Sequence, residues 1–303
     1  MATYEIGERI KKAREDCGMT QEELAYGICS AGTLSKIENG VQVPNKKTFE
    51  SLMQRLGEPE YLYSIHLSRN EVQEMKLYRQ IERCLQKEDM IRAEQLLKQY
   101  QDSFAGTKRL EQQSYQAILA FCHAKQGAAP AQVIEELEAA LCLTMKGYRS
   151  GLPGKCKRLT FEEVSILNNI AVQYYQMGER EKSFSYLKWL KGYFEKNELD
   201  EEEQAEIYPL ILCNYADMLH MQGKLKEARK AARRGIWLCK EYAQTEPLAY
   251  LLGSMARILL SMGKRGEAEE YFKQAECLMC IMGSYGALKD LRENNRESLS
   301  LML

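Results

Sequence analysis

The apolar residues of the first 58 positions recur three and four apart, which is the spacing of amphipathic α-helices. This pattern predicts helices over residues 4–17, 20–28, 30–39 and 45–56. A glycine follows the first, third and fourth of these segments, a position at which helices commonly end. We therefore expect a small N-terminal helical domain over residues 1–58.

The second and third of these helices have the layout of a helix-turn-helix. Thr20 can cap the second helix, with Glu23 three residues on for a capping box, and Ser30 can cap the third. Leu34 and Ile37 lie three apart and are expected to point inward. The opposite face of the third helix is then presented outward.

From about residue 71 the pattern stays helical and repeats. Three segments superimpose without gaps, each with small residues seven before and five after a glycine, at Gly178, Gly223 and Gly263. Two weaker units precede them, so about five helical pairs are expected. The glycines are 45 and 40 residues apart, and we expect the extra length between repeats, around residues 196–203 and 241–246. The repeats resemble tetratricopeptide repeats.

Three segments fall outside this pattern. Residues 59–70 are interpreted as a linker, in which the lone His66 is expected to be structural rather than catalytic. Residues 146–158 are basic and contain glycines, and we expect a solvated loop there, with contact to DNA as the alternative. Residues 287–303 are leucine-rich and are expected to cap the repeat array. The predicted domains are thus 1–58, a linker 59–70 and a repeat domain 71–303, in an all-α fold.

Composition narrows the possible functions. The net charge of the 303 residues is −1, so DNA binding must rest on local clusters of lysine and arginine. The ten cysteines mostly occupy apolar helical positions and predict reduced, buried thiols. No basic-then-apolar leader and no apolar run of roughly 20 residues is present. We expect a soluble, cytoplasmic protein without membrane contact.

The N-terminal motif resembles the XRE/Cro/C1-type repressors. Their Arg-x-x-x-Gly-x-Thr-Gln-x-x-Leu-Ala start and Ile-Glu-x-Gly finish are matched at Arg14, Gly18, Thr20, Gln21, Leu24, Ala25, Ile37, Glu38 and Gly40. The resemblance implies an ion pair between Arg14 and Glu38 and a double-stranded DNA operator as partner. Gln21, Lys36, Lys46 and Lys47 suit phosphate contacts. The family's base-reading positions fall on Ala31, Gly32, Thr33 and Ser35, where Ala31 and Gly32 offer no hydrogen-bonding side chain, and Ser30 is assigned to the same DNA-binding surface.

The repeat register predicts a polar row on the first helices of the repeats. Asn169, Asn214 and Ser254 occupy equivalent positions, with Asp217 and Arg257 one turn further along their helices, and Gln176 is assigned to the same site. An asparagine amide both donates and accepts hydrogen bonds, so it can bind the backbone of an extended peptide. The alternative is that the asparagines are merely tolerated on a hydrated face.

A Cro-type domain followed by such repeats resembles the peptide-pheromone-responsive regulators of Gram-positive bacteria, the Rgg/Rap/NprR/PlcR/PrgX group. The resemblance implies a homodimer that binds operator DNA and holds a short signalling peptide in the repeat groove, clamped by asparagines such as Asn169 and Asn214. The alternative hypothesis is an adaptor whose repeats bind a protein partner.

The sequence predicts neither catalysis nor a metal or cofactor. His66, His123 and His220 are far apart in the chain, and Cys277-x-x-Cys280 is a lone pair in an apolar helical run. No glycine-rich phosphate loop follows a strand, because no strand is predicted. We therefore expect a regulator and not an enzyme.

Overall fold

The protein is described by a computed structural model that covers residues 3–59, 67–87, 89–106, 108–154, 158–197, 199–284, 286, 288–289 and 291–293. Every regular element in these ranges is helical, which confirms the predicted all-α class. The chain divides into two compact units. The first unit comprises Met1–Leu85 with Asp89–Met177, and the second comprises Gly178–Leu303 with Gln86–Glu88.

The first unit begins with the four predicted short helices. They are α1 (Thr3–Asp16), α2 (Gln21–Ala25), α3 (Ala31–Glu38) and α4 (Lys46–Leu56). Their buried core includes Ile10, Leu24, Leu34 and Leu52, and it also takes in Leu110 from a later helix. Burial of these side chains, at roughly 1.5 to 3 kcal/mol for each large aliphatic group, is the main stabilisation available to helices this short.

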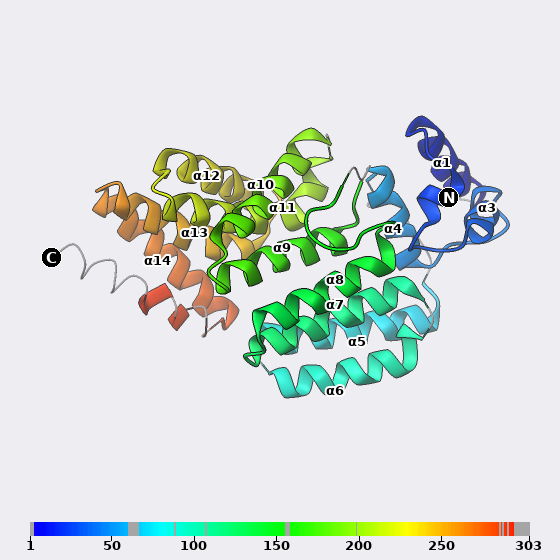
Figure 1. Cartoon of the computed structure of the whole chain (residues 1–303), viewed down its shortest axis with the longest axis horizontal. Coiled ribbons are helices and arrows are strands. Elements are labelled where there is room, and N and C mark those ends of the chain that lie inside the picture. The colour runs from blue at the N-terminus through cyan, green and yellow to red at the C-terminus, as the bar shows by residue number, and fades with distance from the viewer. Residues whose placement is uncertain are drawn as a thin grey trace. The chain divides into compact units, whose positions relative to one another are not determined.

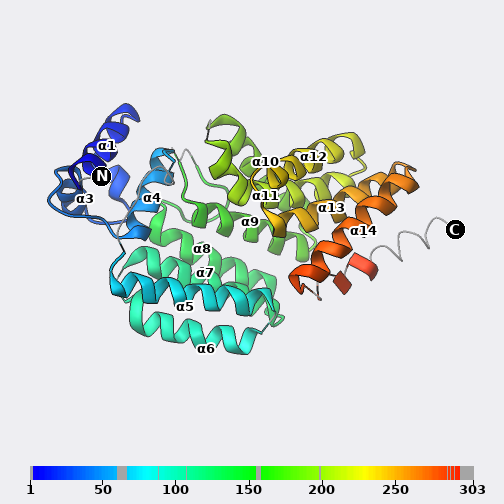
Figure 2. The ribbon, with the colours of Figure 1, turned by 180° about the vertical axis from the view of Figure 1, so that it is seen from behind.

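Five further α-helices and one short π-helix complete the first unit. They are α5 (Arg69–Gln86), α6 (Met90–Tyr100), the π-helix η2 (Gln101–Ala105), α7 (Arg109–Lys125), α8 (Pro130–Thr144) and α9 (Phe161–Gln176). Both ribbon views show α5, α6, α7 and α8 side by side (Figure 1, Figure 2). Helix α5 begins inside the predicted linker 59–70. Residues 60–66 of that linker, His66 among them, lie outside the described residues.

The second unit contains the helices that follow Gly178. They are α10 (Arg180–Lys196), α11 (Glu201–Met221), α12 (Leu225–Glu241), α13 (Thr245–Ser261) and α14 (Arg265–Met282). Helix α12 packs on α11 and on α13, and α13 packs on α14, in the row visible in Figure 2. Phe194 of α10 stacks on Tyr208 of α11, with ring centroids 4.5 Å apart.

Ten successive α-helices, α5 to α14, occupy the region in which about five helical pairs were expected. The turn glycines Gly178, Gly223 and Gly263 have φ values of 80°, 72° and 77°, a left-handed conformation that side chains other than glycine rarely adopt. The prediction that the additional residues of each repeat lie between repeats, around residues 196–203 and 241–246, was wrong. Only short connections follow α10 and α12, and the additional residues lengthen helices such as the 21-residue α11.

The remaining segments differ in part from expectation. Among the described residues of 287–303, Leu288 and Leu291 are buried, and the other leucines of that segment lie outside the description. In the basic segment 146–158, Pro153 is buried, and Arg158 donates a hydrogen bond to the Leu56 carbonyl oxygen. This segment therefore touches the N-terminal helices at its end and is not wholly a solvated loop.

The cysteines are less uniformly buried than predicted. Cys122, Cys213 and Cys239 are buried free thiols, but Cys142, Cys277 and Cys280 are exposed. The exposed positions lie on the outer faces of α8 and α14, where an apolar-looking residue does not contribute to the core. Within the described ranges, no helix combines the length and hydropathy needed to cross a membrane.

Candidate DNA-binding and ligand-binding sites

Helix α3, the second helix of the predicted helix-turn-helix, begins with the cap that the sequence predicts, as does α2 before it. Thr20 Oγ1 accepts from the Glu23 amide, and the Glu23 side chain accepts from the Thr20 amide, which completes the capping box of α2. The Thr33 amide donates to Ser30 Oγ over 3.0 Å at the start of α3. These bonds satisfy amide groups that the first turn of a helix leaves without intrahelical partners.

The outer face of α3 carries the predicted base-reading positions. Gly32 and Lys36 are exposed, and Ala31, Thr33 and Ser35 are partly exposed. The inner face carries Leu34 and Ile37, which are buried. The face available to a DNA groove is therefore short and contains hydroxyl groups and one lysine, and base contact by these residues stays a prediction.

The ion pair expected between Arg14 and Glu38 is present. Arg14 Nε lies 2.6 Å from Glu38 Oε1, and Arg14 Nη2 lies 3.0 Å from Glu38 Oε2. Arg14 Nη1 also donates to the Met19 carbonyl oxygen at 2.9 Å. The hydrogen bond to Glu38 raises the pKa of Arg14. This buried fork ties the end of α1 to the end of α3.

Gln21 does not point freely toward a phosphate in this structure. Its Nε2 donates to Glu38 Oε2 over 2.7 Å. The side chain thus completes the network around the Arg14–Glu38 pair. A sequence motif places Gln21 at a helix start, but it does not reveal that a neighbouring carboxylate accepts its hydrogen bond.

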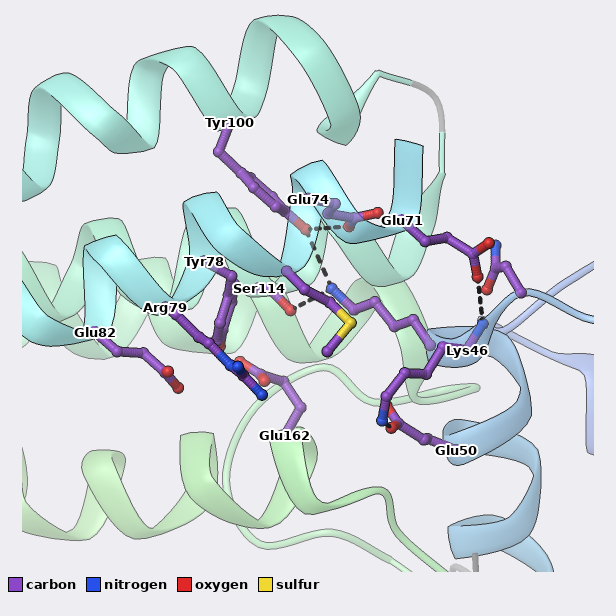
Figure 3. Close-up of a pocket in the computed structure, with 13 residues that line it drawn as sticks. Lys46, Glu50, Glu71, Glu74, Tyr78, Arg79, Glu82, Tyr100, Ser114 and Glu162 are labelled. Carbon is purple, nitrogen blue, oxygen red and sulfur yellow. Dashed lines mark hydrogen bonds and ion pairs between the residues drawn. The ribbon is translucent and has the colours of Figure 1, made fainter. Parts of the chain in front are cut away.

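Two of the predicted phosphate-binding lysines are engaged within the protein. The Lys46 ammonium pairs with Glu50, and the Lys46 amide donates to Glu71 Oε1 over 2.8 Å. Lys47 was placed wrongly, because it lines a pocket of the first unit, where its ammonium donates to Ser114 Oγ (2.8 Å) and to Tyr100 Oη (3.3 Å). Figure 3 labels both of these acceptor residues. The aliphatic stem of lysine allows such an inward path, which the sequence alone does not indicate.

Sequence reasoning missed a second buried cation on α4. Arg55 Nη2 lies 2.7 Å from Glu163 Oε1, and both side chains are buried. Thr144 Oγ1 donates to the same carboxylate oxygen over 2.7 Å, and Arg55 Nη1 donates to the Tyr26 carbonyl oxygen at 2.5 Å. The capping box formed by Thr160 and Glu163 fixes this carboxylate at the start of α9. The predicted DNA-binding helices are therefore fastened to α8 and α9 by charged groups.

The second unit brings together four of the predicted peptide-binding residues. Arg257 Nη2 on α13 lies 2.8 Å from Asp217 Oδ1 on α11 and 3.0 Å from Ser254 Oγ. Asn214 lies half-buried one turn before Asp217 on the same face of α11. Ser254 is fully buried, so its hydroxyl serves Arg257 and does not form an exposed contact position as the register predicted. This difference arises because α13 packs on both of its neighbours.

Exposed apolar side chains flank this ion pair. Leu210 and Met221 lie on the same side of α11 as Asp217, and Tyr250 lies on α13. The spacing of 210, 214, 217 and 221 places these residues on one helical face. A surface with a charged centre and apolar ends can accept an extended segment of mixed chemistry.

The other two predicted peptide contacts belong to α9 in the first unit. Asn169 is half-buried and Gln176 is exposed. Whether Asn169 and Asn214 bind one ligand together therefore stays a prediction. Among the described residues, no group of three or more His, Cys, Asp or Glu side chains is arranged to hold a metal ion.

Residues 10–62 match the helix-turn-helix family. No curated protein sequence matches the chain significantly.

Among solved structures, the chain is similar to Bacillus thuringiensis PlcR in complex with the peptide PapR7 and DNA. The TM-score is 0.61 and the identity 18%, over 95% of this chain and 99% of that one. PlcR in its apo form gives a TM-score of 0.56 at 16% identity, over 96% and 98%. ComR from S. thermophilus, in complex with DNA and its signalling peptide ComS, gives 0.51 at 13%, over 97% and 99%. The chain therefore carries an N-terminal helix-turn-helix domain and shares its fold with PlcR over nearly its whole length.

Proposed function

We propose that this protein is a DNA-binding transcriptional regulator of the pheromone-responsive type whose repeats bind a short signalling peptide. One observation carries the proposal: the fold matches, over at least 95% of the chain, structures that were solved with both DNA and a signalling peptide. The outward face of α3 supports the DNA-binding half. The Asp217–Arg257 pair between exposed apolar side chains supports the peptide half.

In the proposed DNA complex, Thr33 and Ser35 face the base edges and Lys36 faces a phosphate. Hydroxyl groups can pair with more than one base, so Thr33 and Ser35 alone give modest discrimination. Ala31 and Gly32 allow close approach and favour recognition through thymine methyl groups and DNA shape. A homodimer is proposed with this arrangement, because two recognition helices read half-sites about one helical turn, roughly 10 bp, apart or a multiple of that distance.

In the proposed peptide complex, Asn214 of the second unit binds the peptide backbone. Asp217 and Arg257 satisfy each other in the structure, since their charged atoms are 2.8 Å apart. A peptide with a charged or polar side chain at that point can exchange hydrogen bonds with this pair without leaving either charge unpaired. Leu210 and Tyr250 then favour an apolar neighbour in the peptide.

The decisive experiment is native mass spectrometry of the protein purified from the cells that naturally express it, with and without a duplex selected from a random DNA pool. We expect a dimer that binds the duplex and retains a peptide of a few residues. Retention of a folded protein partner instead of a peptide would favour the adaptor hypothesis. Failure to select any duplex would contradict the DNA-binding half of the proposal.

A further inference from the structure

Helix α12 of the second unit is more positively charged than any other helix in the described ranges. Its 17 residues contain six Lys or Arg and two Glu, a formal charge of +4, whereas the whole chain has a net charge of −1. The small and aliphatic side chains of α12 are mostly buried, and the helix packs on α11 and on α13. The opposite face is exposed, so positive charge is concentrated on one outer surface of α12.

The exposed face carries a straight row of side chains, which we call the basic stripe. It consists of Lys226, Lys230, Arg233, Trp237 and Lys240, all of them exposed. Steps of four, three, four and three residues keep successive side chains on one face of a helix. At 1.5 Å per residue the stripe is about 21 Å long. The two acidic residues of α12, Glu227 and Glu241, lie beside its ends.

The cations of the basic stripe have no acidic partners. Two flanking arginines of α12 pair with glutamates of neighbouring helices, namely Arg229 with Glu267 and Arg234 with Glu201. By contrast, within the described part of the chain no hydrogen bond or ion pair involves the lysines and the arginine of the stripe. Lys226 and Lys230 are four residues apart, and Lys230 and Arg233 are three apart, spacings at which like charges destabilise a helix. A bound polyanion would relieve this repulsion.

Trp237 adds a flat surface to the row of cations. Its side chain is 40% exposed although tryptophan is normally well buried. The guanidinium carbon of Arg234 lies 4.4 Å from the Trp237 ring centroid, and Tyr242 contacts the ring edge-on. These contacts orient the indole, whose N–H can donate to an anionic oxygen and whose ring can pack on a sugar.

The composition of the stripe favours a nucleic-acid backbone over other anionic partners. Trp237 is the one exposed large apolar side chain of α12, and a helix that binds a membrane surface needs a broad apolar face. A protein interface likewise needs an apolar centre. Duplex DNA requires neither, because it presents one negative charge per about 1.7 Å of its axis.

The N-terminal domain offers fewer free cations than its sequence suggests. Arg14, Lys46 and Lys47 are all engaged within the protein. Phosphate contacts of the helix-turn-helix therefore rest on few residues, such as the exposed Lys36. A DNA-binding chain of net charge −1 gains attraction for phosphates from a second positive surface.

We propose that the basic stripe of α12 binds the phosphates of double-stranded DNA without reading its sequence, as a second DNA contact in addition to the helix-turn-helix. The choice of DNA among polyanions rests on the proposed function. Lys226, Lys230, Arg233 and Lys240 contact phosphates, and Trp237 packs on the backbone between them. The contact needs no particular arrangement of the two units, because every duplex offers the same phosphates.

The test is fluorescence anisotropy of the full chain with a short labelled duplex of mixed sequence, at several salt concentrations. The stripe variant combines Lys226→Ala, Lys230→Ala and Arg233→Ala. We expect it to bind the duplex at least about tenfold more weakly than the wild type. The slope of log K against log salt concentration should become shallower by roughly 2 to 3, because each phosphate contact contributes about 0.9 to it. An unchanged slope would overturn the proposal.

A matched control removes the same charge from the first unit. It combines Lys76→Ala, Arg83→Ala and Lys98→Ala, at exposed positions of α5 and α6, and should bind as the wild type does. Equal losses in the two variants would show that only net charge matters. Without DNA, the stripe variant should melt at or above the wild-type temperature, because alanine favours a helix and like-charge repulsion is removed. A lower melting temperature would indicate a structural role and contradict the assignment.

Tryptophan fluorescence reports where the duplex binds. The chain contains two tryptophans, so Trp189→Phe leaves Trp237 as the only one. Saturating duplex should protect Trp237 from quenching by acrylamide, and unchanged quenching would place the DNA elsewhere and refute the proposal. Tighter binding of polyglutamate than of the duplex, at equal charge concentration, would assign the stripe to an acidic protein segment instead.

Failure of this inference is distinguishable from failure of the proposed function. Selection of an operator duplex, together with an unchanged salt slope in the stripe variant, would contradict the inference alone. Failure to select an operator, together with a shallower slope in the stripe variant, would contradict the proposed function alone.

Discussion

Replacing Arg55 with methionine tests how firmly the helix-turn-helix is fastened to the helices that follow it. The substitution keeps much of the buried volume but leaves the Glu163 carboxylate, which is 0% exposed, without its counter-charge. Thr144 Oγ1 and the Thr160 amide still donate to that carboxylate. Removal of one partner of a buried pair typically costs roughly 3 to 5 kcal/mol.

The structure places the expected value near the lower end of that range. Arg55 Nε is buried without a hydrogen-bond partner in the described part of the chain, so the wild-type pair already carries a penalty. The Tyr26 carbonyl oxygen additionally loses the bond from Arg55 Nη1. We expect Arg55→Met to lower the free energy of unfolding of the first unit by about 3 to 4 kcal/mol.

The choice of assay follows from the positions of the tryptophans. Trp189 and Trp237 both lie in the second unit, so tryptophan fluorescence does not report directly on the first unit. Hydrogen exchange of the α4 and α9 amides, with urea unfolding followed by far-ultraviolet circular dichroism, measures the relevant stability. A loss of about 3 kcal/mol corresponds to roughly hundredfold faster exchange where opening is a rapid pre-equilibrium and the chemical exchange step is limiting.

A double-mutant cycle isolates the ion pair. Arg55→Met combined with Glu163→Gln should be less destabilised than the sum of the single variants by at least about 1 kcal/mol, because the double variant contains no buried unpaired charge. Arg233→Met, at an exposed position of α12, is the control and should stay within about 0.5 kcal/mol of the wild type. Additive single effects, or unchanged protection of α4 in Arg55→Met, would refute the reasoning.

Three other predictions concern separate parts of the molecule. Lys36→Ala should weaken binding to all DNA sequences alike and reduce the slope of log K for DNA binding against log salt concentration by about one, whereas Lys47→Met should leave that slope unchanged. Fluorescence anisotropy at several salt concentrations measures the slope, and equal slopes for Lys36→Ala and the wild type would contradict the prediction. Asn214→Ala should lower the affinity for the cognate peptide by about 5- to 150-fold, or roughly 1 to 3 kcal/mol, as measured by calorimetry. An unchanged affinity would show that Asn214 does not contact the peptide. Gly7→Ala should destabilise the N-terminal helices by roughly 1 to 3 kcal/mol, because the new Cβ would lie 2.1 Å from the Ile37 carbonyl oxygen of α3. Gly192→Ala, which has open space around it, should be neutral or stabilising by up to about 1 kcal/mol, and thermal unfolding of both variants checks the difference.

Local sequence signals predicted the helices and their ends well. The capping residues Thr20 and Ser30 fixed the starts of α2 and α3, and the turn glycines fixed the repeat register, because caps and left-handed turns depend on a few neighbouring residues. The Arg14–Glu38 pair was predicted from the resemblance to the XRE/Cro/C1-type repressors, which implies pairing of these two motif positions.

Contacts between distant segments were not predictable in this way. The inward path of Lys47 and the pairing of Arg55 with Glu163 depend on how α4 meets α7, α8 and α9, which no local pattern specifies. The burial of Ser254 likewise depends on packing of α13 between its neighbours. A single sequence shows which residues can form charged contacts but not which of them face each other across a tertiary interface.

The position of Leu110 has a consequence for the evolution and engineering of such proteins. This residue belongs to α7, yet it is 5% exposed within the hydrophobic core of the N-terminal helices. A chimaera that joins only residues 1–58 to another repeat domain would leave that core without one of its aliphatic side chains. The remaining repeats of this chain would then expose Leu110 to water. Recombination between relatives is therefore expected to conserve stability only when the crossover lies beyond α9, so that recognition specificity and the first repeats are inherited as one module.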